Sequence, residues 1–158
     1  MNELLKAFAA TLPTLAAAGM TAATHELLGS PDFDFREALR GPFPAARFAG
    51  EATASVAVTL RGGTWDVIVA DNKASVLLSV PTDLSAERPL PAELLLHLLA
   101  RNAGTRYGKW VAMPDRGGFN VLVMACLPTR GLTGEAIREC AEALAFETAQ
   151  LYGKLGRD

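Results

Sequence analysis

Apolar residues alternate along two strand-like stretches between residues 107 and 128, which meet at Asp115-Arg116-Gly117-Gly118. The Gly-Gly pair supplies the positive φ that a tight connection needs, so this segment predicts a β-hairpin. With a loop of either two residues (117–118) or four (115–118), one face carries Trp110, Ala112, Pro114, Phe119, Val121, Val123 and Ala125. The other face is also substantially apolar, with Val111, Met113, Leu122, Met124 and Cys126. A sheet with one face in water does not need two apolar faces, so we interpret the second face as a contact surface for another chain.

The same alternation predicts three earlier strands, with turns at Gly62-Gly63 and Asn72-Lys73. Two-residue loops at these turns align Leu60 with Trp65 and Val69 with Val76, which places the large apolar residues of all three strands on one face. The reverse face is mostly polar, and we expect it to be exposed to water. Its residues are Ser55, Ala57, Thr59, Asp66, Ile68, Ser75, Leu77 and Ser79.

Apolar residues spaced by three and four predict the helices. Residues 1–28 present one such face, and Pro13 should kink or split that helix. Residues 91–103 contain Leu94, Leu95, Leu98 and Leu99, while Leu96 widens the apolar surface beyond one stripe. We therefore expect this helix to contact both its own sheet and a partner subunit.

Capping residues predict where two further helices begin. Asp34 followed by Glu37 has the form of a capping box and predicts a short helix over residues 35–40. Thr133 is the predicted N-cap of a final amphipathic helix that packs on the sheet.

The order of predicted elements is a helical region, three strands, a helix, two strands and a helix. This order predicts an α+β fold, with an antiparallel sheet of about five strands (a three-strand meander, a helix and a hairpin) packed with helices. At 158 residues we expect a single domain over 1–158. It would consist of an N-terminal helical region and loop (1–49) and an α+β core (50–158).

Composition and charge narrow the classes of partner. Half of the residues are hydrophobic, 20% are charged and the formal net charge is −2, so nothing electrostatic favours a nucleic acid or an anionic membrane. No run is long and apolar enough to cross a bilayer. The Ala-rich start resembles a signal peptide, but Glu3 and Pro13 argue against one, and we expect a cytoplasmic protein.

The sequence offers little catalytic chemistry. His25 and His97 are the only histidines, and no nucleophile motif accompanies them. Asp66 and Asp71 could form a catalytic pair of carboxylates. A simpler interpretation is that Asp71 is a turn residue and that Asp66 lies on the reverse face of the sheet. Cys126 and Cys140 lack metal-binding spacing and are interpreted as buried free thiols. We therefore expect that this protein is not an enzyme and that it has no catalytic residue, cofactor or metal.

One basic stretch supports an alternative function. Residues 101–130 hold five basic residues against one acidic residue, and Arg106, Lys109 and Arg116 form a candidate anion patch among aromatic residues. Such a patch could bind a single-stranded nucleic acid. However, Trp110 and Phe119 are predicted to face the core while Lys109 faces the other way, so we do not expect direct nucleic-acid binding.

Residues 50–155 resemble the YbjN family, which in turn looks like the type III secretion chaperones. The resemblance rests on LLLHLLARN (94–102), GKWVAMPD (108–115), FNVLVMACLP (119–128) and GLTGEAIRECAEAL (131–144). It implies a homodimer that binds other proteins without a cofactor. The family generally has one short helix before its first strand, whereas about fifty residues precede that strand in this chain.

These observations lead to one functional hypothesis: a cytoplasmic, non-enzymatic adaptor or chaperone-like homodimer that binds a partner protein. The predicted dimer or partner interface combines the helix at 91–103 with the outer face of the second hairpin. Its residues are Leu95, Leu96, Leu99, Val111, Met113, Leu122 and Met124.

Overall fold

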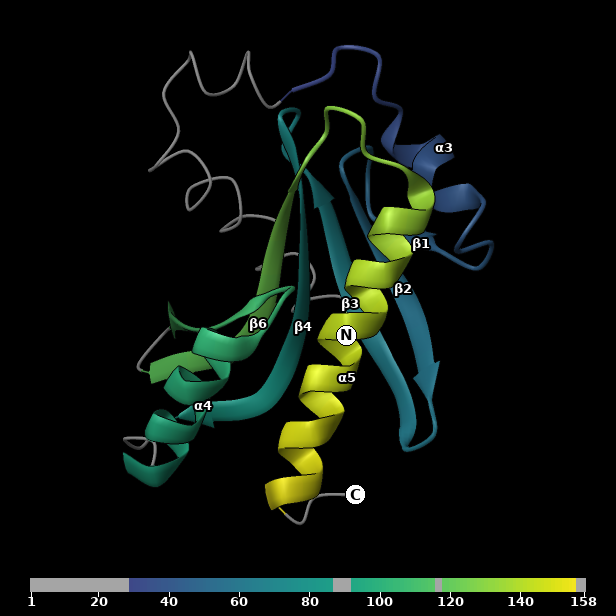
Figure 1. Ribbon diagram of the computed structural model, residues 1–158. Helices are drawn as coiled ribbons and strands as arrows, with labels where there is room; N and C mark the ends of the chain where they lie inside the picture. Colours follow the sequence, from purple (N-terminus) through teal and green to yellow (C-terminus); the bar gives the residue numbers. More distant parts are fainter. Residues whose placement is uncertain (1–28, 87–91, 116–117, 156–158) are drawn as a thin grey trace.

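A six-stranded antiparallel sheet with helices packed on it forms the framework of the computed structural model (Figure 1), which describes residues 29–86, 92–115 and 118–155. The helix predicted within residues 1–28 lies outside the described residues. The sheet order is β1-β2-β3-β4-β6-β5. The elements in chain order are α3 (Phe35–Arg40), β1 (Arg47–Phe48), β2 (Thr53–Leu60), β3 (Gly63–Asp71), β4 (Ser75–Ala86), α4 (Ala92–Gly104), β5 (Lys109–Asp115), β6 (Gly118–Pro128) and α5 (Gly134–Leu155).

The predicted α+β class is confirmed, with one strand more than expected. The extra strand is β1, a two-residue segment that pairs with β2 at the edge of the sheet. Two residues are too few for an alternating pattern to reveal. The β2–β3–β4 meander and the β5–β6 hairpin occur where the sequence predicts them.

The predicted faces of the strands are correct, but the predicted register of the meander is wrong by two residues. Val58, not Leu60, lies opposite Trp65, because Leu60 pairs with Gly63 and the turn therefore falls one residue earlier than expected. In β3–β4, Val69 lies opposite Leu78. A shift of two preserves which side chains share a face, since side chains alternate with a period of two. In the second hairpin Pro114 pairs with Phe119, as in the four-residue loop alternative.

The main core lies between the first face of the sheet and the helices, and α5 runs diagonally across the strands (Figure 1). Leu144 of α5 and Leu39 of α3 have no exposed surface. The caps that begin these two helices are as predicted. Asp34 accepts a hydrogen bond from the Glu37 amide at 2.9 Å, and the Thr133 hydroxyl accepts one from the Ala136 amide at 3.2 Å.

The reverse face of the meander is not exposed throughout, and that expectation is corrected. Ala57 and Thr59 are exposed, but Ile68 and Leu77 are buried, and so are three serines, Ser55, Ser75 and Ser79. The face continues into β6 and β5, where Leu122 and Met113 complete a second apolar cluster. Serine is small and uncharged, so the free-energy cost of burying it is far lower than that of burying a charged side chain. Several serines on one face of a sheet therefore do not by themselves indicate that the face is exposed to water.

Candidate protein interface

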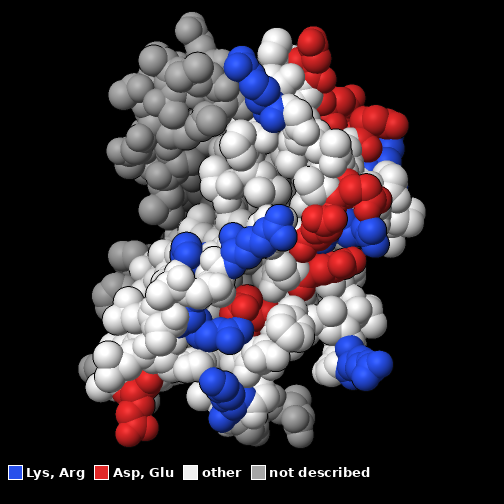
Figure 2. Space-filling model, viewed as in Figure 1, with Lys and Arg blue, Asp and Glu red and all other residues white. Residues whose placement is uncertain are grey.

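The α4 helix has two apolar sides. Leu94 and Leu98 face inward and pack against the main core, together with Trp110 of β5. The opposite side, which we call the α4 stripe, is formed by Ala92, Leu95, Leu96, Leu99 and Ala103, spaced by three, one, three and four residues. Its leucines are 43%, 66% and 64% exposed, in chain order. The surface over α4 is largely uncharged in Figure 2. A helix that keeps three leucines in water is poised to contact another protein surface.

Two side chains of α4 fasten the helix to the rest of the fold. The Asn102 side chain donates to the Trp110 carbonyl at 3.0 Å and accepts from the Trp110 amide at 2.6 Å, so it takes the place of a neighbouring strand at the edge of β5. Arg101 donates to both carboxylate oxygens of Glu147 on α5, at 2.7 Å each from its Nη2. The α4 stripe therefore sits on a firmly held element rather than on a loose one.

The hairpin residues of the predicted interface lie on the other side of the sheet. Met113 is 8% exposed, Leu122 is 1% exposed, and Val111 and Met124 are partly buried. All four belong to the second apolar cluster, whereas α4 packs on the first face. The structure thus separates the seven predicted interface residues into two surfaces, and contact of the hairpin with another chain stays a prediction.

Several residues that shape these surfaces carry no signal in the sequence pattern. The α4 helix is held by the pairing of Arg101 with Glu147, 46 residues away, and of Asn102 with Trp110, eight residues away. No local sequence pattern indicates either pairing. Phe146 of α5 is a further apolar side chain that is 52% exposed. It lies two residues after Leu144, on the side of α5 away from the buried stripe, so the helical spacing of the sequence already places it at the surface.

The candidate anion patch is only partly assembled. Arg106 is exposed and its guanidinium lies 5.2 Å from the ring centre of Tyr107. The Lys109 ammonium donates to the Asn102 carbonyl, and Arg116 lies outside the described residues. Of the neighbouring cations, Arg101 is neutralised by Glu147. On the face shown in Figure 2, basic and acidic side chains are interspersed, an arrangement that gives little concentrated positive field.

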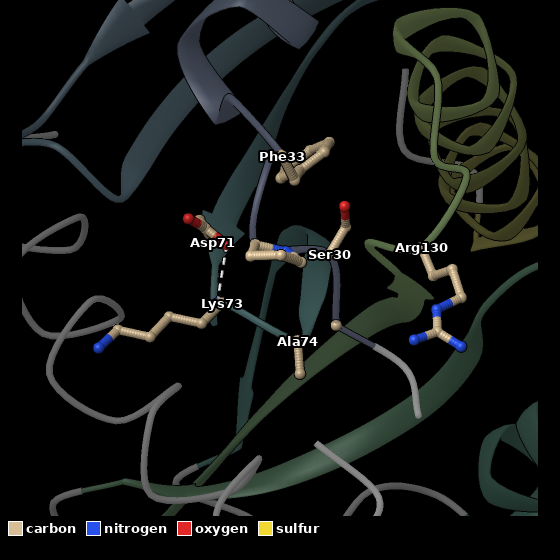
Figure 3. Close-up of a pocket in the computed structure, with 8 residues that line it drawn as sticks. Ser30, Phe33, Asp71, Lys73, Ala74 and Arg130 are labelled. Carbon is tan, nitrogen blue, oxygen red and sulfur yellow. Dashed lines mark hydrogen bonds between the residues drawn. The ribbon is translucent and has the colours of Figure 1, made fainter. Parts of the chain in front are cut away.

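An open hollow of about 510 Å³ lies where the described chain begins, beside the turn between β3 and β4. Asp71, Lys73 and Arg130 lie around it, with Ser30 and Phe33, and the Lys73 and Arg130 side chains lie on opposite sides of it (Figure 3). Asp71 is partly buried and its carboxylate accepts from the Lys73 amide at 2.8 Å, while both basic side chains are exposed. None of the charged side chains described around this hollow is buried, so none of them is held in a fixed position to select a ligand.

The two candidate carboxylates have structural partners. Asp66 accepts from Arg47 at 2.8 Å and from the Ser55 hydroxyl at 3.4 Å, and Asp71 forms the turn just described. Within the described ranges, no group of three or more His, Cys, Asp or Glu side chains could hold a metal ion. In the same part of the chain, no helix has the length and apolar character needed to cross a membrane.

The two cysteines differ, and the expectation that both are buried is wrong for Cys126, which is exposed on the second face of the sheet. Cys140 is buried in the main core, and burial raises the pKa of its thiol to about 12. The thiolate is the reactive form. We expect a thiol reagent to modify one cysteine in the native protein and two in denaturant, with no native reaction of Cys140 between pH 7 and 10. Mass spectrometry of a Cys126→Ser variant checks the assignment, since rapid native labelling of that variant would contradict it.

The comparisons with known proteins come to one structural likeness. No protein-family model matches the chain, and no curated protein matches it. The resemblance to the YbjN family therefore stays a prediction. Among solved structures, the chain is similar to the type III secretion chaperone SycH of Yersinia pestis, in a crystal structure with a stable fragment of YscM2. The identity is 16%, the TM-score is 0.44, and the match covers 61% of this chain and 79% of that chain.

Proposed function

We propose that this protein is a cytoplasmic, non-enzymatic adaptor of the chaperone-like kind, which acts as a homodimer and binds a partner protein. The observation that carries the proposal is the α4 stripe, in which Leu95, Leu96 and Leu99 are exposed on a helix held by Asn102 and Arg101. Of the seven interface residues predicted from the sequence, the proposed dimer contact uses these three leucines.

A second copy of the chain is the occupant that fits the stripe best. A two-fold interface brings the same patch of both copies together, so an uncharged apolar stripe is complementary to itself. Leu96 lies near the middle of the stripe, which spans Ala92 to Ala103, and would meet its own copy near the axis. The remaining surfaces of the dimer stay available to a partner protein.

The apolar area sets the strength that this dimer can have. The three leucines are roughly half exposed already, so burying each contributes about 1 kcal/mol, or roughly 6 kcal/mol from both copies before the cost of association. That cost is of the same order as the gain. We therefore expect a dimer that dissociates on dilution rather than one that never separates.

Charge introduced into the α4 stripe tests the proposal. We expect Leu96→Glu combined with Leu99→Glu to shift the protein from dimer to monomer at tens of micromolar, because the two carboxylates of each copy would be buried against those of the other. Sedimentation velocity over a dilution series measures the shift, and circular dichroism shows that the variant is folded. The matched control is Leu155→Glu, which alters a leucine that is 37% exposed at the end of α5. A wild-type protein that is monomeric throughout the series would contradict the proposal, and so would an equal effect of the control.

A further inference from the structure

The edge of the sheet formed by β5 carries a side-chain contact where a further strand would pair. β5 has β6 on one side and no strand on the other. In an antiparallel pair, the backbone groups of successive residues point alternately toward the paired strand and away from it. The N–H and C=O groups of Trp110 point away from β6, because both are bonded to the Asn102 side chain, at 2.6 and 3.0 Å. The backbone groups of Ala112 and Pro114, two and four residues later, therefore point to the open side as well.

Asn102 binds Trp110 as the backbone of a neighbouring strand would. A carboxamide side chain has both a donor and an acceptor, as a peptide group has, whereas a carboxylate only accepts and an ammonium only donates. The connection between α4 and β5 holds this side chain over the edge. The Thr105 hydroxyl donates to the Gly108 carbonyl at 2.8 Å, and the Lys109 ammonium donates to the Asn102 carbonyl.

Little of this edge remains for another strand. Pro114 has no N–H group, and a proline at an outward-facing position of an edge strand discourages further pairing. Among the described residues of β5, Ala112 is then left with both an N–H and a C=O group directed outward, and it is exposed. The shortest strand in the described part of the chain, β1, pairs over two residues, Arg47 and Phe48, one more than Ala112 alone offers.

We infer that Asn102 closes the β5 edge, so that another strand, above all the β5 strand of a second copy, cannot add to the sheet there. A strand that is apolar on both faces and open at its edge is a template for pairing with another chain. β5 has this character, since Trp110 on one face and Met113 on the other are both buried apolar side chains. The inference concerns the edge of the sheet and does not depend on the proposed function of the α4 stripe.

Asn102→Ala tests the inference, because it frees both Trp110 groups while alanine still favours the helix. We expect part of this variant to sediment, at several hundred micromolar, at about twice the mass of the wild-type species, because two open edges pair about a two-fold axis. Adding Ala112→Pro should return the mass to that of the wild type. Proline at this position removes an outward N–H group and no hydrogen bond to β6.

Two comparisons separate edge pairing from a loosened α4. Arg101→Ala removes the ion pair with Glu147 and leaves Asn102 in place, so it should produce no species heavier than the wild type. Heavier species that arose from a loosened helix would survive the addition of Ala112→Pro. Survival of this kind, heavier species from Arg101→Ala, or a folded Asn102→Ala protein of wild-type mass would each overturn the inference. Each mass is compared with that of the wild type, so the test works whether the wild type is a monomer or a dimer.

Asn102→Leu keeps the inference testable if the alanine variant does not fold. Leucine has a similar shape and a higher helix propensity, but it forms no hydrogen bond with Trp110. We expect the same gain in mass, and the same return to the wild-type mass when Ala112→Pro is added, with circular dichroism showing that both proteins are folded. A folded leucine variant that sediments as the wild type does would contradict the inference and would leave the role of the α4 stripe unaffected.

Discussion

Replacing Gly108 with alanine is expected to lower the free energy of unfolding by roughly 2–5 kcal/mol. Gly108 has a φ of 72°, in the left-handed region that residues with a Cβ adopt at a cost. A Cβ there would also lie 2.2 Å from the Cδ2 atom of Leu144 and 3.2 Å from Val123. Leu144 is completely buried against the sheet, so it cannot move aside without disturbing the core.

Gly131→Ala is the matched control for this substitution. Its φ of 71° is nearly identical, but a Cβ at Gly131 would meet no atom within 4 Å. This variant should lose only the conformational part, about 1–2 kcal/mol. Urea unfolding followed by circular dichroism gives both values. Equal losses in the two variants would show that Leu144 does not pack against Gly108.

Leu39→Ala is expected to cost roughly 2–5 kcal/mol, because it leaves a cavity in the main core. Leu39 has no exposed surface and packs in the main core, where α3 is in contact with α5. The matched control is the same substitution at Leu96, a helical leucine that is 66% exposed, where the change should stay within about 0.5 kcal/mol. Denaturant titrations at a protein concentration low enough to dissociate the proposed dimer compare the two variants as monomers. A large loss for Leu96→Ala under these conditions would mean that this leucine is buried by its own chain.

The side-chain pattern was sufficient to predict the faces of the sheet. Every large apolar residue assigned to the first face of β2, β3 and β4 lies there, although each hairpin is displaced by two residues. The face depends only on parity, whereas the register depends on which residues form the turn, and Arg61-Gly62-Gly63 allows more than one choice. The caps at Asp34 and Thr133 were predictable because they act over three residues.

What covers each surface could not be predicted, because coverage is decided by contacts between distant segments. The apolar second face of the hairpin suggested another chain, yet Leu122 is already buried. The polar character of Ser75 and Ser79 suggested water, yet both are buried. In α4, by contrast, the width of the apolar surface correctly indicated leucines beyond those that the core requires, and Leu95, Leu96 and Leu99 are exposed.

Disulfide trapping between two copies tests the central claim about the α4 stripe most directly. In a Cys126→Ser background, Leu96→Cys should form a covalent dimer under mild oxidation, because a two-fold contact brings this position of both copies within disulfide reach. Glu93→Cys, exposed on another side of the same helix, should remain largely monomeric. Covalent dimer from position 96 and little from position 93 is the predicted result. No dimer from position 96, or equal amounts from both positions, would contradict the claim that α4 joins two copies of this chain.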